Sequence, residues 1–202
     1  MDAALKLLTP AEYLAFERKS KTKHEYYAGR IVEMAGATKA HNLIGSNVIF
    51  ILMRQLRGRS GEVYPSDMRV KIPATGLYTY PDVIVVATEA LLEDAERDIL
   101  LNPTIIVEVL SASTENYDRG EKFHSYRTIE SLQEYVMIAQ DSHHIEHYVR
   151  QPNGQWLLSE ATSLAETIHL PTIDCALPLS DVYDKVTVVP KTASSRFNGH
   201  VN

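Results

Sequence analysis

"NPTIIVEVLS", residues 102–111, is an apolar run interrupted by a single carboxylate, Glu108. A second stretch, "YTYPDVIVV" at residues 78–86, places Asp82 at the start of another apolar run. Runs of this kind are typical of neighbouring strands that are buried on both faces of a sheet. Because an unpaired carboxylate is costly to bury, two such acids on two central strands indicate a role beyond packing.

The composition predicts one globular domain. The chain has 202 residues, of which 45% are hydrophobic, and this is enough for a single core. We expect the domain to span residues 1–190 and the polar segment 191–202 to be a disordered tail. The net charge of −6 argues against a nonspecific basic coat for nucleic acid.

Other features of the composition concern the compartment. The single Cys175 excludes an internal disulfide and a cysteine-rich zinc site. No apolar run approaches the roughly 20 residues of a membrane span, and the N-terminus lacks the pattern of a signal peptide. We therefore expect a cytoplasmic protein that does not contact membranes.

Three segments carry helix signals. Thr9 and Pro10 open "TPAEYLAFERKS" as an N-cap and a first helical residue. The segment "HNLIGSNVIFILMRQLRGR" repeats apolar residues at helical spacing, at positions 44, 48, 51, 52 and 56. The segment "NYDRGEKFHSYRTI" predicts a third helix, with Lys122 and Tyr126 one turn apart on the same face.

Strand signals fill much of the remaining chain. "HEYYAGRIVEM" predicts a hairpin that turns at Ala28 and Gly29. Three candidate strands follow: "EVYPSDMRVKI", "YTYPDVIVVA" and "PTIIVEVLS". The acidic segment 88–100 between the last two is expected to be a surface helix or a loop. A meander ends the domain: "QEYVMIAQ", "HIEHYVRQ" and "QWLLSEA". This order predicts an α+β fold, with a mixed central β-sheet flanked by helices and an additional antiparallel β meander.

The two acids suggest metal chemistry if their strands are neighbours. Asp82 and Glu108 would then converge at one edge of the sheet, and their repulsion would raise the pKa of at least one carboxyl group. A hard cation such as Mg²⁺ or Mn²⁺ relieves that repulsion and can promote hydrolysis of a phosphate ester. Lys122, on the helix after the Glu108 strand, can reach back to stabilise developing charge.

These residues carry a family resemblance. Pro81-Asp82, followed by a strand that holds Glu108, resembles the PD-(D/E)XK signature of the restriction-endonuclease-like nucleases. Four longer segments are similar to one bacterial family, the Uma-two family: "HEYYAGRIVEMAGATKAHNLIGSNV", "PDVIVV", "PTIIVEVLSASTENYDRGEKFHSYRTIESLQEYVMI" and "HIEHY". The resemblance covers roughly residues 7–185.

The resemblance implies an endonuclease that hydrolyses DNA and depends on Mg²⁺ or Mn²⁺. Asp82 and Glu108 are the expected metal ligands and catalytic acids. The superfamily lysine normally stands two residues after the second acid, where this chain has Leu110, so Lys122 is the expected catalytic lysine. Glu25 matches an accessory acid, although a surface ion pair with Lys23 or Arg30 is an alternative.

Other interpretations stay open at this stage. The scaffold could be a catalytically inactive nuclease fold that binds nucleic acid or a protein partner, or a dimerisation module. We expect a homodimer, the commonest soluble assembly, with the meander at residues 133–160 as the candidate interface. The histidines of "HHIEH" lack the spacing of a zinc site. A structural role is favoured for His41 near the long helix, and packing for Tyr126.

Overall fold

The computed structural model describes residues 7–111 and 114–189, so the predicted tail at 191–202 lies outside the described residues. In chain order the elements are α1 (Pro10–Glu17), β1 (His24–Tyr27), β2 (Arg30–Glu33), α2 (Lys39–Leu56), β3 (Glu62–Pro65), β4 (Arg69–Ile72), β5 (Leu77–Thr79), β6 (Val83–Val86), β7 (Ile99–Leu100), β8 (Ile105–Leu110), α3 (Glu115–Tyr117), a π-helical turn (Asp118–Lys122), α4 (Phe123–Tyr126), β9 (Glu134–Ala139), β10 (Ile145–Arg150), β11 (Trp156–Ala161), β12 (Thr167–Leu170), β13 (Cys175–Pro178) and α5 (Leu179–Val182).

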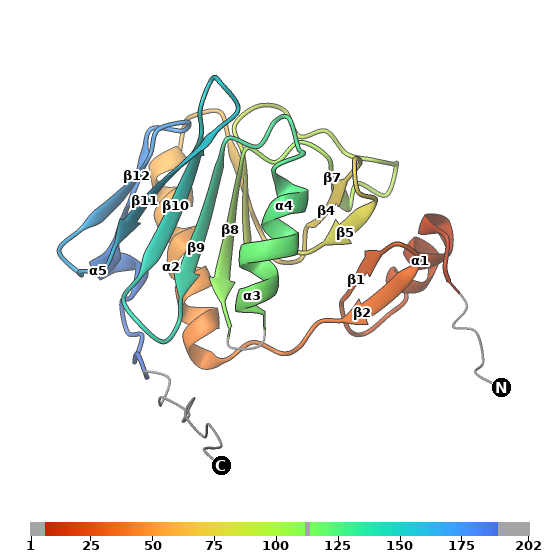
Figure 1. The fold of residues 1–202 in the computed structure, drawn as a ribbon, viewed down its shortest axis with the longest axis horizontal. Helices are drawn as coiled ribbons and strands as arrows, with labels where there is room; N and C mark the ends of the chain where they lie inside the picture. Colours follow the sequence, from red (N-terminus) through yellow and green to blue (C-terminus); the bar gives the residue numbers. More distant parts are fainter. Residues whose placement is uncertain (1–6, 112–113, 190–202) are drawn as a thin grey trace, which may run out of the picture.

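The predicted α+β fold with a mixed central sheet is confirmed. Six strands form the central sheet in the order β11-β10-β9-β8-β6-β3, in which β8 and β9 are parallel. Helix α2 covers one face, and α3, the π-helical turn and α4 cover the other (Figure 1). A five-stranded sheet, β2-β1-β5-β4-β7, lies beside the central sheet. The predicted meander, β9 to β11, is antiparallel from β9 onward and continues the central sheet through β9.

The central core forms as the apolar pattern predicts. All five apolar positions of α2 are buried, at residues 44, 48, 51, 52 and 56. They pack against one face of the central sheet, on the expected strand residues Val83, Val85, Ile105, Val107, Val109, Val136 and Ile138. The opposite face packs separately, against the helical segment that contains Phe123 and Tyr126. No helix of the described residues is long and apolar enough to cross a membrane.

Two predicted strands are wrong in one respect, because each is two strands that lie in different sheets. Residues 62–72 form β3 in the central sheet and β4 in the five-stranded sheet. The stretch around Pro81 likewise divides into β5 and β6. Pro81 has no N–H to donate and restricts the residue before it, so the strand is interrupted there. As a result Asp82 lies where the chain passes from one sheet to the other.

The remaining expectations concern local structure. The hairpin turns at Ala28 and Gly29, both with positive φ (48° and 85°), which is the backbone of the tight turn that suits twisted strands. Segment 88–100 contains no helix, so the loop alternative is correct, and β7 at its end pairs in parallel with β4. The predicted third helix is divided by a π-helical turn, a feature that is frequent at functional sites.

Candidate active site

The strands of the two predicted acids are neighbours. Strands β6 and β8 pair antiparallel, with Val83 opposite Val107, so the register continues to place Asp82 opposite Glu108. The backbone N–H of Val109 donates to Asp82 Oδ2 at 2.7 Å, which fixes that carboxylate against the β8 strand. The two carboxylates therefore converge at one edge of the central sheet.

Lys122 lies at the centre of this group of acids, beside the ends of β6 and β8. Its Nζ is 3.0 Å from Glu108 Oε1, 3.3 Å from Glu25 Oε1 and 3.4 Å from Asp118 Oδ1. The side chain is only 6% exposed, so Lys122 is not a lysine of the helix surface. The π-helical turn points Asp118 and Lys122 inward together. The lysine thus reaches the second acid from the following helix instead of from position 110 of the same strand.

Glu25 reaches the cluster from the five-stranded sheet. It lies on β1, accepts a hydrogen bond from the hydroxyl of Thr79 on β5, and pairs with Lys122. The surface alternative does not hold for Lys23, which pairs with Asp67 at 2.6 Å. Both sheets therefore contribute acids to one site, and the break at Pro81 is what brings them together.

Three further residues belong to the site. His41 Nε2, in the first turn of α2, is 3.2 Å from Asp82 Oδ2, so His41 contacts a predicted ligand instead of serving only the helix. The Tyr126 hydroxyl donates to Glu108 Oε1 at 2.7 Å, a contact beyond the packing expected of that side chain. Asp118 was not predicted, although its position one helical turn before Lys122 was a usable signal.

The site is closed on one side and open on the other. Glu108, Asp118 and Lys122 are buried, at 4%, 3% and 5% exposure. The side chains of Asp82 and His41 are each 18% exposed. A small ligand would therefore enter from the side of Asp82 and His41 and meet Glu108 and Lys122 behind them.

Burial and crowding shift the protonation of this cluster. Burial raises the pKa of Glu108 to about 8; Lys122 opposes this, whereas Asp118 and Asp82 add to it. The raised pKa that the sequence predicted is present, but burial is its largest cause and repulsion between the acids is secondary. Burial also raises the pKa of Asp118. Burial lowers the pKa of Lys122, yet Glu108, Glu25 and Asp118 outweigh it and hold that pKa well above its ordinary value.

The donor set fits a hard divalent cation. Four carboxylates meet here, those of Glu25, Asp82, Glu108 and Asp118. Their basic partners are Lys122 and His41. Carboxylate oxygens are the ligands that Mg²⁺ and Mn²⁺ prefer, and surplus negative charge favours binding. Asp82 and Glu108 are the residues that would hold the ion, since Asp82 faces the open side and Glu108 lies opposite it.

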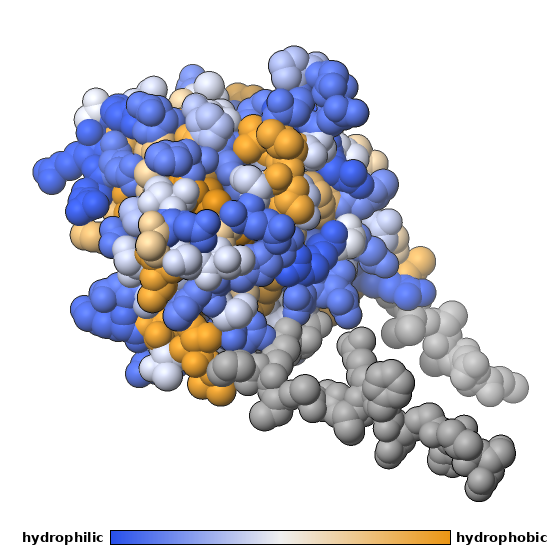
Figure 2. Space-filling view, turned by 60° about the vertical axis from the view of Figure 1, so that its left-hand side comes forward, coloured by the Kyte–Doolittle hydropathy of each residue, from blue (hydrophilic) through white to orange (hydrophobic). Residues whose placement is uncertain are grey.

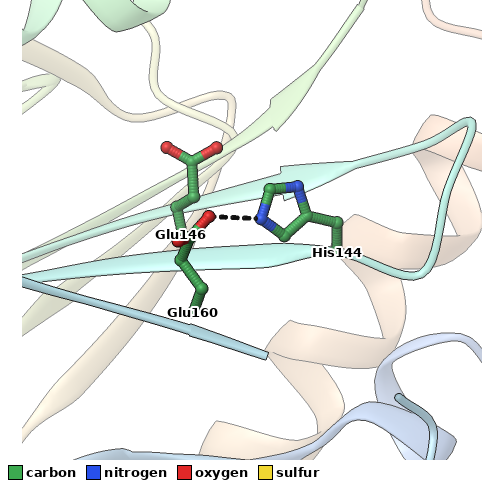
Figure 3. A group of neighbouring side chains, drawn as sticks. All are labelled: His144, Glu146 and Glu160. Carbon is green, nitrogen blue, oxygen red and sulfur yellow. Dashed lines mark hydrogen bonds and ion pairs between the residues drawn. The ribbon is translucent and has the colours of Figure 1, made fainter. Parts of the chain in front are cut away.

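A second group of possible metal ligands lies on the meander (Figure 3). His144, Glu146 and Glu160 bring their ligand atoms within 4.8 Å of one another. His144 Nε2 is 2.9 Å from Glu160 Oε1, and the Arg119 guanidinium pairs with Glu146. These ion pairs account for the cluster, so we assign no metal to it.

The raised pKa values predict how metal-free stability depends on pH. Glu108 ionises less readily in the folded protein than in the unfolded chain. Its contribution to the free energy of unfolding therefore decreases as the pH rises from about 4.5 to about 8. The raised pKa of Asp118 acts in the same direction, as does that of His41, where Asp82 outweighs the lowering by burial. We expect the free energy of unfolding, measured with urea in chelator, to decrease across this range.

The matched variants isolate Glu108. Glu108→Gln should be nearly as stable as the wild type at the acid end and more stable at the alkaline end, since it has no carboxyl group to ionise. Glu89→Gln, at an exposed position, should leave the slope unchanged. A wild-type free energy of unfolding that stays constant or increases over this range would contradict the assigned protonation.

Comparisons with known proteins identify the family. The family model for Uma2, described as "Putative restriction endonuclease", matches residues 10–180. Two proteins of Synechocystis sp. (strain ATCC 27184 / PCC 6803 / Kazusa) are similar: "Uncharacterized protein sll1609" is 41% identical over 158 residues, covering 78% of this chain and 89% of that protein. "Uncharacterized protein slr1290" is 33% identical over 176 residues, covering 87% and 91%.

A solved structure shares the fold. The crystal structure of "a putative nuclease belonging to DUF820" from Anabaena variabilis ATCC 29413 superposes with a TM-score of 0.72. It covers 89% of this chain and 99% of that chain at 16% identity. The family match spans most of the chain, and the chain therefore belongs to the Uma2 family.

Proposed function

We propose that this protein is an endonuclease that hydrolyses DNA phosphodiester bonds with the help of Mg²⁺ or Mn²⁺. The observation that carries the proposal is the 3.0 Å contact between Lys122 Nζ and Glu108 Oε1. In this proposal Lys122 takes the part of the signature lysine, from a different element and in contact with Glu108. The family and the nuclease-like fold support the same reaction class.

The metal would be held by Asp82 and Glu108. When bound there, Mg²⁺ or Mn²⁺ supplies Lewis-acid chemistry that polarises a phosphoryl oxygen and makes water a better nucleophile. Asp82 is oriented by the Val109 N–H and by His41, and Glu108 by the Tyr126 hydroxyl. These contacts keep both carboxylates in place before substrate arrives, which is the preorganisation that catalysis requires.

Lys122 provides the positive charge for the reaction. Its raised pKa keeps the ammonium group charged at neutral pH. With three donors, this group can orient an attacking water and stabilise the charge that develops on the phosphoryl oxygens. Glu25 and Asp118 lie on two further sides of Nζ and position it. We therefore assign Glu25 a positioning role.

The open side of the site suits an anionic substrate. Helix α2 begins at Lys39, and its first turn carries His41 at that opening. The amino end of a long helix favours negative charge. Asp82 outweighs burial in raising the pKa of His41, which favours its cationic form. A phosphate group approaching Asp82 would thus meet favourable charge from α2.

One variant pair separates metal binding from cleavage. Asp82→Asn should abolish the Mg²⁺-dependent rise in melting temperature, which for the wild type reflects about 2.7 kcal/mol at a hundredfold excess over the dissociation constant. Lys122→Met, which keeps the length and removes the charge, should retain a melting shift but lose at least about 100-fold in plasmid cleavage rate. Circular dichroism verifies that both variants fold.

The control is Asp67→Asn, at an exposed acid that pairs with Lys23 outside the site, and it should keep both properties. A wild type with no melting shift in millimolar Mg²⁺ or Mn²⁺ would refute the metal-dependent nuclease. A wild type that binds the ion but cuts no DNA would favour the alternative of a catalytically inactive nuclease fold that binds nucleic acid or a protein partner. That alternative has one structural point in its favour, because the ion pairs of Lys122 also stabilise the fold.

We further propose a homodimer that pairs through the meander. Strand β11 is at the edge of the central sheet, and Leu158 on it is exposed. Figure 2, which brings the side with β11 and β12 forward, shows a mostly hydrophilic surface with a few compact apolar patches. An exposed sheet edge readily pairs with another strand. A two-fold dimer of this kind would carry one active site in each copy.

Sedimentation tests the dimer. We expect a dimer at micromolar concentration, and Leu158→Glu should shift it toward monomer because charge at a sheet edge opposes pairing. Leu91→Glu changes an exposed leucine in a loop away from the meander and should have no effect. A monomeric wild type would overturn the dimer, and an equal effect of both variants would overturn the proposed interface.

A further inference from the structure

An open groove lies between α4 and the β10–β11 hairpin, with a volume of about 850 Å³. Phe123, Tyr148 and Trp156 are among its lining residues, together with Arg127. A smaller hollow adjoins it, sharing Arg127 and Trp156 and adding Arg150. The groove thus combines aromatic rings with cationic side chains, although the chain as a whole has a net charge of −6.

The aromatic rings form a packed floor. The Phe123 ring lies 4.8 Å from that of Tyr148 and 5.4 Å from that of Trp156, measured between centroids. Phe123 also stacks on Tyr135 at 4.8 Å, which anchors the floor to the central sheet. Tyr148 and Trp156 remain partly exposed. Rigid, partly exposed rings of this kind provide stacking surfaces for nucleobases.

The cations are held against these rings and are not neutralised by ion pairs. Arg127 Cζ lies 5.1 Å from the Phe123 ring centroid, and Arg150 Cζ lies 4.7 Å from that of Trp156. Among the described residues, neither guanidinium forms a salt bridge. Arg150 Nη2 donates to the backbone oxygens of Arg127 and Ile129, whereas the buried Nε of Arg150 has no hydrogen-bond partner. Burial lowers the pKa of Arg150, with only Glu130 opposing. An anion in the groove would satisfy both charges.

The groove lies on the same face of the central sheet as the active-site acids. Phe123 directly follows Lys122 in the chain, so one helical segment serves both places. The Tyr135 ring that stacks on Phe123 is also 5.5 Å from the ring of Tyr126, whose hydroxyl binds Glu108. A chain of packed rings therefore connects the groove to the acids.

The chemistry of the groove favours an unpaired strand over a duplex. In a duplex the bases are stacked on one another, and their faces are not available to Trp156 or Tyr148. An unpaired strand offers base faces for the rings and phosphates for the arginines. Only a few basic side chains gather here, which suits a short local contact better than the long phosphate contact of a duplex. The carboxylate of Glu146, which is also on β10, has its own cationic partner in Arg119 and does not need Arg127 or Arg150 to balance its charge.

We propose that this groove binds an unpaired DNA strand, with a base stacked on Trp156 and Tyr148 and phosphates bound by Arg127 and Arg150. The proposal rests on the proposed nuclease function and specifies its substrate class. It assigns the groove to nucleotides away from the cleaved bond, since Tyr148 lies opposite Tyr135 near the start of β9, whereas Glu108 lies opposite Met137. Arg127 and Arg150 are thus positioning residues, since they touch the substrate away from the reacting phosphate.

The protein carries its own probe for this proposal. Trp156 is the single tryptophan of the chain, so selective excitation of the indole reports on the groove alone. Metal-free protein in chelator is titrated with a short single-stranded oligonucleotide, and separately with a duplex of the same sequence. We expect saturable quenching by the single strand and at least about tenfold weaker binding of the duplex.

Charge variants locate the binding surface. Arg127→Ala should weaken single-strand binding at least about fivefold and should reduce its dependence on salt. Arg54→Ala is the matched control, because Arg54 Cζ also lies over an aromatic ring, Phe50 at 5.9 Å, but on α2 at the opposite face of the sheet. It should bind as the wild type does. Circular dichroism confirms that each variant folds.

Three other outcomes would contradict the proposal that the groove binds an unpaired DNA strand. Absence of indole quenching by the single strand, equal binding of the duplex, or an equal effect of Arg54→Ala would each contradict it. The test is independent of the nuclease proposal because it needs no metal. Asp82→Asn should bind the oligonucleotide with wild-type affinity while losing cleavage. If binding in the groove is absent although the wild type cuts plasmid DNA, only the groove proposal fails.

Discussion

The ion pairs of Lys122 hold the two sheets and the helical segment together at one point. Removing this ammonium group would leave the surrounding buried acids without their partner, and such a loss typically costs about 3–5 kcal/mol. Here one ammonium group satisfies acids from β1, from β8 and from the π-helical turn. The position of Glu25, the inward turn of Asp118 and the contact with Tyr126 all follow from this arrangement.

The same arrangement explains how the proposed nuclease site can have Leu110 at the position where the PD-(D/E)XK signature has a lysine. Leu110 is buried in the core on the helical face of the sheet, so a lysine there would have to be accommodated within packed apolar side chains. Lys122 instead extends from the π-helical turn that packs on this face of the sheet, and its ammonium group lies beside Glu108. The chemistry requires a charge at a point in space, and the chain meets that requirement from another element.

Much of this could be predicted from the sequence, because periodicity reports burial directly. The core strands and the apolar face of α2 follow from local patterns, whereas the pairing of the Asp82 and Glu108 strands was a condition that the structure fulfils. The divided strands could not be predicted, since β-propensity does not reveal which sheet a strand joins. His41 was undervalued for a similar reason: its contact with Asp82 joins residues far apart in the chain. The pKa of Glu108 depends on burial more than on sequence neighbours.

The central claim is that Asp82 and Glu108 form a divalent-cation site beside Lys122. Anomalous X-ray scattering from crystals soaked in Mn²⁺ tests it most directly, because the signal identifies the ion and its position together. We expect a manganese peak in contact with carboxylate oxygens of Asp82 and Glu108. A peak confined to His144, Glu146 and Glu160, or no peak between Asp82 and Glu108 at saturating Mn²⁺, would contradict it.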